Sequence, residues 1–157
     1  MEKKAILEFK KVRKIFRTST VLNDCSFKVY NHEILAVLGK SGTGKSTIIK
    51  LLLGLHIPDR GEILYEGKEL SYQNKDFAKI VGYVSQENSF YEKLTVQENL
   101  IFFGKLYDVN KKDIEYRSRE LLNLVKLTSA KHTIADKLSG GMKRRLEFAI
   151  SLIHNPH

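Results

Sequence analysis

One short stretch decides the fold, Gly39-Lys40-Ser41-Gly42-Thr43-Gly44-Lys45-Ser46-Thr47. It fits the pattern G-x-x-x-x-G-K-[ST], which is the pattern of a phosphate-binding loop. An apolar run over residues 34–38 precedes the loop, and a helical pattern over residues 46–53 follows it. A strand, a glycine-rich turn and a helix in this order are the context that the motif requires. The stretch therefore predicts an α/β fold, in which a buried strand of a parallel sheet leads into the loop.

The chemistry of this loop suits a polyphosphate. Consecutive backbone N–H groups in such a turn form a concave positive nest, and the start of the following helix adds free N–H groups. We expect Lys45 to reach the β- and γ-phosphates and the Ser46 hydroxyl to ligate Mg²⁺. Every residue of the stretch 39–47 is thus a candidate for nucleotide binding. A glycine-rich turn without a ligand is the alternative, and kinases, GTPases and ATPases all share this motif.

Patterning elsewhere predicts a β part followed by helices. Residues 5–16 alternate roughly, residues 25–30 predict a second strand, and residues 61–67 predict a strand between glycines. The apolar run 80–84 predicts another buried strand of the parallel sheet. Helical periodicity begins after these strands, so the order of elements is that of a mixed α/β chain.

The helical region opens with a clear start signal. Thr95 followed by Glu98 predicts a capping box, at the head of a helix that runs to about Tyr107. A second helix is predicted over residues 111–127. Its apolar stripe is expected to comprise Ile114, Leu121, Leu122 and Val125.

Composition fits a soluble globular protein. The chain has 157 residues, of which 42% are hydrophobic, and its 27 Lys and Arg against 18 Asp and Glu give a net charge of +9. One cysteine, Cys25, excludes an internal disulfide. We find no apolar stretch long enough for a membrane span and no signal peptide, so we expect a cytosolic chain. The positive charge is compatible with nucleic acid, with an anionic membrane face or with an ordinary solvated surface.

A second motif lies near the C-terminus, Leu138-Ser139-Gly140-Gly141-Met142. It resembles the Leu-Ser-Gly-Gly-Gln signature of the ATP-binding cassette (ABC) family, with Met142 in place of the glutamine amide. A helix is predicted to follow over residues 142–153, and its start would offer N–H groups and a hydroxyl to an anion. The alternative is that Ser139 serves only as an N-cap before a glycine turn.

Two further elements carry the same resemblance, which covers nearly the whole chain. Val84-Ser85-Gln86-Glu87 is similar to the Q-loop of the family, and Phe16 stands where the family has its A-loop aromatic. The resemblance implies that Phe16 stacks on adenine and that Gln86 ligates Mg²⁺ or water. A place in the hydrophobic core is the alternative for Phe16.

The resemblance implies an ATP-binding subunit of a membrane transporter, with ATP and Mg²⁺ as its ligands. In the family two nucleotide-binding subunits pair head to tail, so the signature would contact the ATP of the partner. A transmembrane transporter subunit is the second implied partner, with residues 88–110 as the docking surface. This partner would place the chain at the cytoplasmic face of the membrane.

The division of the chain follows from the same resemblance. We expect a β and phosphate-loop core over residues 1–91, a helical insert over residues 92–138, and the signature helix over residues 139–157. Together they would form a P-loop NTPase core with an N-terminal antiparallel β part and a helical insert.

The family also predicts elements that this sequence does not contain. In the family a strand ending in Asp, a catalytic Glu and a switch histidine follow the signature helix, whereas this sequence ends at Asn155-Pro156-His157. We interpret Glu66 and Asp136 as surface carboxylates that do not replace the missing acids. The chain is therefore expected to be a partial nucleotide-binding domain that lacks the C-terminal strands. On its own it would bind ATP without hydrolysing it, because hydrolysis needs those carboxylates.

Three alternatives remain at this stage. An ABC-type ATPase that acts on nucleic acid or the ribosome suits the positive charge, although the basic residues lack interleaved aromatics. An inert fragment is the second, because absent strands would leave the core incomplete. A P-loop kinase or GTPase is the third, but the sequence has no Asn-Lys-x-Asp segment.

Overall fold

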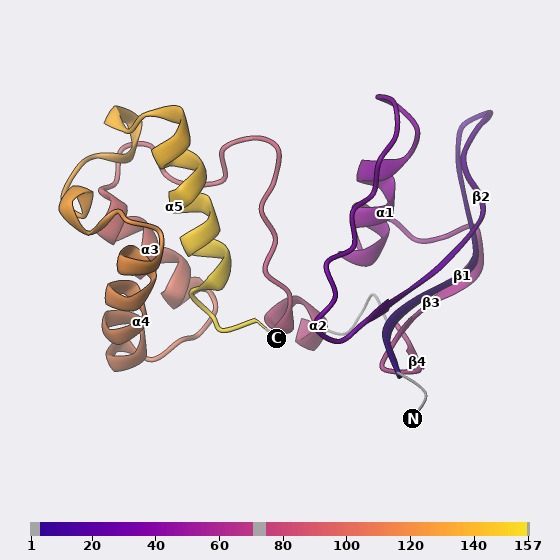
Figure 1. Ribbon diagram of the computed structural model, residues 1–157, viewed down its shortest axis with the longest axis horizontal. Helices are drawn as coiled ribbons and strands as arrows, with labels where there is room; N and C mark the ends of the chain where they lie inside the picture. Colours follow the sequence, from indigo (N-terminus) through magenta and orange to yellow (C-terminus); the bar gives the residue numbers. More distant parts are fainter. Residues whose placement is uncertain (1–3, 71–74, 157) are drawn as a thin grey trace. The chain divides into compact units, whose positions relative to one another are not determined.

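The computed structural model describes residues 4–70 and 75–156 (Figure 1). The chain divides into two compact units, Met1–Lys75 and Asp76–His157. The first unit holds the strands and the phosphate-binding loop, and the second holds the predicted helical region and the signature. The finer division at residues 91 and 138 stays a prediction.

The first unit is built on an antiparallel sheet with the strand order β2-β1-β3-β4 (Figure 1). The strands are β1 Ala5–Phe16, β2 Ser19–Tyr30, β3 Arg60–Tyr65 and β4 Lys68–Glu69. β1 is a central strand, because it pairs with β2 on one side and with β3 on the other. The three predicted strands are confirmed, and the predicted antiparallel β part with them. β2 starts at Ser19 rather than at the predicted residue 25. The reason is that β1 and β2 form a long two-stranded ribbon, whose last pair is Phe16 with Ser19.

The sheet and the helix after the phosphate-binding loop share a small apolar core. Phe9 and Ile63 come from neighbouring strands, and both are almost fully buried. Phe9 also stacks on Phe27 of β2, with 4.4 Å between the ring centroids. The helix is α1, Lys45–Leu52, and it buries Leu51 completely. Burying these apolar side chains supplies the driving force for the first unit.

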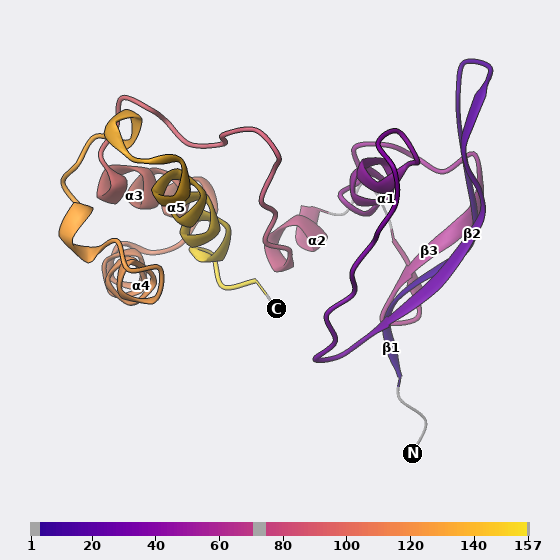
Figure 2. The same cartoon turned by 45° about the horizontal axis from the view of Figure 1, so that its top comes forward.

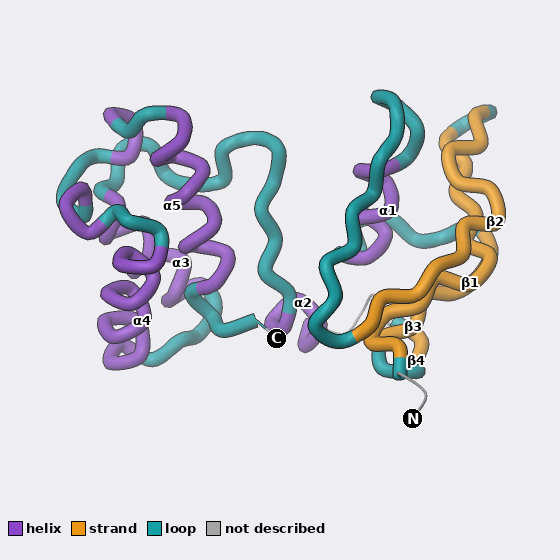
Figure 3. The backbone as a smooth tube through the Cα atoms, in the orientation of Figure 1, coloured by secondary structure: helices purple, strands orange, loops and turns teal. Residues whose placement is uncertain are grey.

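Two predicted strands are absent from the described residues. Residues 34–38 form a loop between β2 and α1, in which Ile34 is 97% and Leu38 is 90% exposed (Figure 3). Residues 81–84 also form no strand, and Ile80 is the last residue of a short helix, α2 Lys75–Ile80. A strand exists through hydrogen bonds to a neighbour. No described segment pairs with either run, so both predictions of a parallel strand are wrong for this structure.

The second unit is a cluster of helices. Its long helices are α3 Val96–Leu106, α4 Lys111–Leu124 and α5 Gly140–Leu152, and its short 3₁₀ turns are Thr128–Ala130 and Ala135–Lys137. α3, α4 and α5 pack on one another, as Figure 2 shows from a second direction. Their core contains Val96, Leu100, Leu121, Leu122, Val125, Leu127, Leu146, Ala149, Ile150 and Ile153. All four residues of the predicted stripe on α4, Ile114 included, are buried.

The capping box at the start of α3 is confirmed. The Thr95 hydroxyl accepts a hydrogen bond from the Glu98 backbone N–H at 3.2 Å, and the Glu98 carboxylate accepts one from the Thr95 N–H at 2.7 Å. This exchange satisfies two N–H groups that an isolated helix start would leave unpaired. The hydrogen bonds that the Thr95 N–H and then the Thr95 hydroxyl donate to the Glu98 carboxylate lower its pKa, because they favour the charged form.

No helix in residues 4–70 and 75–156 is both long and apolar enough to cross a membrane.

Candidate nucleotide-binding site

The phosphate-binding loop has a conformation that only glycine adopts without strain. Gly44, the N-cap of α1, has φ 94° and ψ 4°, which lies in the left-handed region. A Cβ atom on Gly44 would lie 2.9 Å from the Leu22 side chain and 3.1 Å from the Val21 carbonyl oxygen. Gly42, with φ 81°, is also in the left-handed region, but a Cβ atom on it would meet no other atom within 4 Å. The loop therefore packs tightly against β2 at Gly44 and is free at Gly42.

Lys45 closes the loop on itself. Its ammonium group donates hydrogen bonds to the carbonyl oxygens of Gly39 at 2.9 Å and Lys40 at 2.6 Å. The Thr43 hydroxyl donates to the same Lys40 oxygen at 2.9 Å. These contacts hold the positive charge of Lys45 inside the turn, and they bring Lys45 close to Gly39, the first residue of the motif.

The start of α1 offers donors that no side chain uses. The N-cap makes no side-chain hydrogen bond, and the first turn contains no acidic residue. Free N–H groups and the positive end of the helix dipole at such a start attract an anion. Ser46 is exposed in this turn, and its hydroxyl oxygen belongs to the class of hard ligand that Mg²⁺ prefers.

Phe16 lies at the end of β1 and is not in the buried core. Its side chain is 37% exposed, and its ring meets the edge of the His56 ring at a centroid distance of 5.0 Å. The Lys14 ammonium lies 5.3 Å from the Phe16 ring centroid. An aromatic face that stays accessible suits stacking on a base, so adenine stacking stays a prediction that this geometry permits. Sequence reasoning missed the contact with His56.

Gln86 belongs to the second unit, where it is exposed in a bend of the segment 85–89. Both ends of this segment are bonded to α5. Arg144 donates a hydrogen bond to the Ser85 carbonyl, and Glu147 accepts one from the Ser89 N–H at 2.9 Å. Sequence reasoning did not find Glu147, although it shares a helix with the signature.

The signature begins α5 as predicted. Ser139 is the N-cap, and its hydroxyl accepts a hydrogen bond from the Met142 N–H at 3.3 Å. Gly140 and Gly141 are exposed, with open space where a side chain would stand. Met142 packs against the apolar core of the second unit. A thioether suits this partly buried position, because it packs on apolar side chains without needing a hydrogen-bond partner.

The carboxylates judged to lie at the surface do so. Glu66 is exposed in the turn between β3 and β4, and Asp136 is exposed beside Lys143, at an oxygen–nitrogen distance of 3.5 Å. Among the described residues, no three His, Cys, Asp or Glu side chains gather into a group that could hold a metal ion. Ser46 and Gln86, the two residues predicted as Mg²⁺ ligands, each carry a side-chain oxygen but lie in different units, so their shared role stays a prediction.

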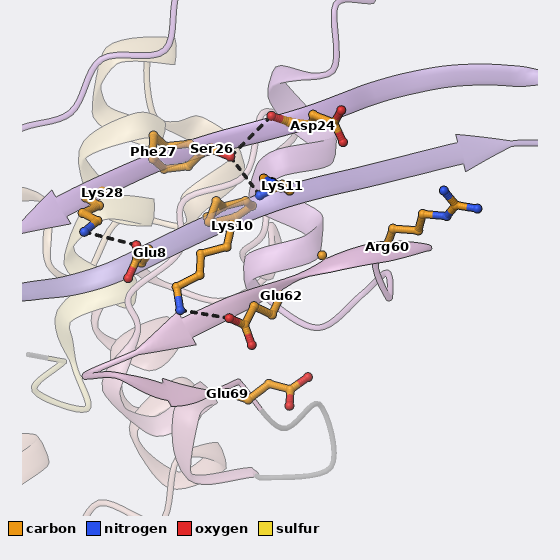
Figure 4. Close-up of a pocket in the computed structure, with 12 residues that line it drawn as sticks. Glu8, Lys10, Lys11, Asp24, Ser26, Phe27, Lys28, Arg60, Glu62 and Glu69 are labelled. Carbon is orange, nitrogen blue, oxygen red and sulfur yellow. Dashed lines mark hydrogen bonds and ion pairs between the residues drawn. The ribbon is translucent and has the colours of Figure 1, made fainter.

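A groove of about 1060 Å³ lies on the sheet of the first unit, away from the phosphate-binding loop (Figure 4). Two of its lysines face its own carboxylates. Lys10 is 2.9 Å from Glu62 and Lys28 is 3.2 Å from Glu8, and Figure 4 shows both pairs across neighbouring strands. Cations that are already paired attract an anionic ligand less, so the glycine-rich loop remains the better candidate site.

Comparison with known proteins agrees with this geometry. The family described as ABC transporter matches residues 22–157. The Nod factor export ATP-binding protein I of Rhizobium sp. (strain N33) is 36% identical over 98% of this chain and 50% of its own length. The methionine import ATP-binding protein MetN of Clostridium acetobutylicum is 36% identical over 96% of this chain and 48% of its own length.

A solved structure matches the backbone. It is cbiO1 from Clostridium perfringens, which its title describes as part of the ABC transporter complex cbiONQ. The TM-score is 0.89 at 24% sequence identity, over 99% of this chain and 63% of the other. This likeness confirms the predicted fold class. The chain spans about half the length of the curated relatives that it matches.

Proposed function

The chain belongs to the ABC transporter family, and from this premise we propose that it supplies the ATP-binding core of a transporter subunit. Residues 39–47 would bind the triphosphate, and the longer protein would use ATP binding and hydrolysis to drive transport across a membrane. Relatives named as ATP-binding proteins of an exporter and of an importer support this core role.

The observation that carries the proposal is the position of Lys45. Its ammonium lies within a turn of left-handed glycines, next to a helix start that no side chain caps. Charge-assisted hydrogen bonds from such a lysine and from free backbone N–H groups suit the dense charge of a triphosphate. Phosphate oxygens would replace the carbonyl oxygens of Gly39 and Lys40 as acceptors for the Lys45 ammonium.

Mg²⁺ would accompany ATP and neutralise phosphate charge, with the hydroxyl of Ser46 as a ligand from the first unit. The resemblance gives the amide oxygen of Gln86, which lies in the second unit, as a further ligand. Phe16, accessible at the end of β1, would stack on adenine. Phe16 would thus contact the base, and the loop would supply the affinity for the phosphates.

Two partners complete the proposal. A second nucleotide-binding subunit would pair head to tail, so that the exposed Ser139, Gly140 and Gly141, with Met142 behind them, contact its ATP. A transmembrane subunit would dock on residues 88–110, where Tyr91, Phe102 and Leu106 are exposed. Burial of these apolar side chains would stabilise that interface. The chain would then lie at the cytoplasmic face of the membrane.

Calorimetric titration of the 157-residue chain with Mg²⁺–ATP tests this proposal. Lys45→Ala is expected to weaken binding roughly tenfold or more, because it removes a charged hydrogen-bond donor from the phosphates. Lys50→Ala is the matched control, since it removes the same charge from the exposed last turn of α1. Equal affinities for the parent chain and the Lys45 variant would contradict the proposal, as would equal losses in both variants.

A further inference from the structure

The helix that begins at the signature also carries a buried acid. Glu147 lies on α5 and is only 3% exposed. Its carboxylate accepts a hydrogen bond from the Ser89 N–H at 2.9 Å and lies 3.0 Å from the Arg144 guanidinium. A charge at this depth is costly unless it is paired and hydrogen-bonded. The contacts to Ser89 and Arg144 are therefore what make this position compatible with a carboxylate.

Arg144 completes a two-point attachment. One of its guanidinium nitrogens donates to the Ser85 carbonyl as well as to Glu147. Two side chains one turn apart on α5 thus hold the carbonyl at one end of the segment 85–89 and the N–H at its other end. The residues between these ends, Gln86 to Asn88, are exposed.

The chain just before this segment is fixed to the other end of the same helix. The backbone at Gly82 approaches α5 so closely that a Cβ atom there would lie 2.6 Å from the Ser151 carbonyl oxygen. The Nε2 atom of His154 lies 3.2 Å from the Val81 carbonyl oxygen. The segment 81–89 is therefore attached to α5, or to His154 just after it, at Val81, Gly82, Ser85 and Ser89, and residues 86–88 between the last two attachments are exposed.

We propose that Arg144 and Glu147 are positioning residues for Gln86, which they hold to the helix that presents the signature. Because both ends of the bend are attached to α5, a displacement of this helix carries Gln86 with it. If contact with a partner's ATP at Ser139 moves α5, Arg144 and Glu147 would then move Gln86 as well. The mechanical link itself is independent of nucleotide, although its use in transport rests on the proposed function.

Amide hydrogen exchange and NMR of the nucleotide-free chain test the link. In Glu147→Ala the Ser89 amide is expected to exchange roughly tenfold faster or more, since its acceptor is removed. The side-chain amide resonances of Gln86 should move toward their unfolded positions at the same time. Glu147→Gln keeps an oxygen acceptor for Ser89 and is expected to restore slow exchange there. Glu120→Ala, which removes an exposed carboxylate from α4, should change neither signal.

Arg144→Ala is a second test of the link. This substitution opens no cavity, because the Arg144 side chain is 55% exposed. It should release the Ser85 end and shift the Gln86 resonances. Arg145→Ala is its matched control. The Arg145 guanidinium donates to the Val125 carbonyl at 3.0 Å, so this variant should disturb residues 125 and 126 instead.

Unchanged Ser89 exchange and unchanged Gln86 resonances in both Glu147→Ala and Arg144→Ala would overturn the proposal. So would a uniform rise in exchange across α3, α4 and α5, since Glu147 would then serve only the stability of the unit. No nucleotide enters these measurements. Their failure would leave ATP binding by residues 39–47 untouched, and a failure of ATP binding would leave the link intact.

Discussion

Gly44 is the residue on which the shape of the phosphate-binding loop depends. Its left-handed backbone admits a side chain only with strain, and a Cβ atom there would press on Leu22 and Val21. Gly67, in the turn between β3 and β4, has a similar φ of 80° but open space around it. Substitutions at these two glycines therefore distinguish the effect of backbone strain, which both would cause, from the effect of displacing the phosphate-binding loop, which only a change at Gly44 would cause.

Gly44→Ala is expected to cost about 1 kcal/mol of stability from backbone strain, as Gly67→Ala also should. Only Gly44→Ala should weaken Mg²⁺–ATP binding, because its new methyl group pushes the loop away from β2. Denaturant unfolding and calorimetric titration of both variants measure the two effects. Equal nucleotide affinity in the two variants would contradict this role for Gly44.

His154 is the histidine of the second unit whose pKa the structure lowers. It stacks on Tyr107 at a centroid distance of 4.0 Å, and its Nδ1 atom is buried without a hydrogen-bond partner. Burial lowers the pKa of His154 from its ordinary value of 6.5, and the nearby Arg117 lowers it further. The unfolded chain thus takes up the proton first as pH falls.

The stability contribution from neutral His154 is therefore present above pH 6.5 and lost as pH falls through the lowered folded-state pKa. We expect the urea midpoint of the helical unit to drop between neutral pH and about pH 5. His154→Gln stays neutral and can still donate to the Val81 carbonyl, so its midpoint should fall less. If the urea midpoints of the parent and of His154→Gln fall equally as pH is lowered, His154 is not the group responsible for the pH dependence.

At the scale of single elements, the start of α3 depends on the capping box. Thr95→Ala is expected to destabilise the second unit by about 1 kcal/mol, because the Glu98 N–H then loses its acceptor. Thr95→Ser keeps the hydroxyl and should retain most of the stability. Unfolding in urea, followed by circular dichroism, compares the two variants. A loss of the same size in Thr95→Ser would show that the methyl group matters rather than the cap.

The elements that could be predicted from the sequence are those fixed by neighbouring residues. The capping box, the glycine-rich loop and the Ser139 N-cap each lie within a few positions of their partners, and all three are found. The runs 34–38 and 80–84 were predicted as strands because they are apolar. Apolar character indicates a need for burial but does not supply the neighbouring strand, which is a nonlocal requirement.

Glu147 was missed for a related reason. A charged residue in a predicted helix is normally assigned to the solvent face, and its partner Ser89 lies 58 positions away. One signal was available in the sequence. Glu147 lies three positions before the buried Ile150, a spacing that puts both residues on one face of the helix. An acid on a buried stripe points to a specific partner rather than to solvent.

At the scale of the whole molecule, the names of the relatives agree on ATP binding and differ in the material that is transported. The relatives include an export protein and an import protein at the same 36% identity. The phosphate-binding loop lies in one compact unit, and Gln86 and the signature lie in the other. In the proposed function, residues 39–47 and Gln86 serve the ATP that the chain itself binds, whereas the signature contacts the nucleotide of the partner.

The most direct test of this account is an NMR titration of the ¹⁵N-labelled chain with Mg²⁺–ATP. We predict that the backbone amides of residues 39–47 shift together and saturate, and that the shifts are lost in Lys45→Ala. Amides of the groove residues Glu8, Lys10 and Glu62 should stay in place. Resonances of residues 39–47 that remain unmoved at saturating Mg²⁺–ATP, in a chain shown to be folded, would contradict the account.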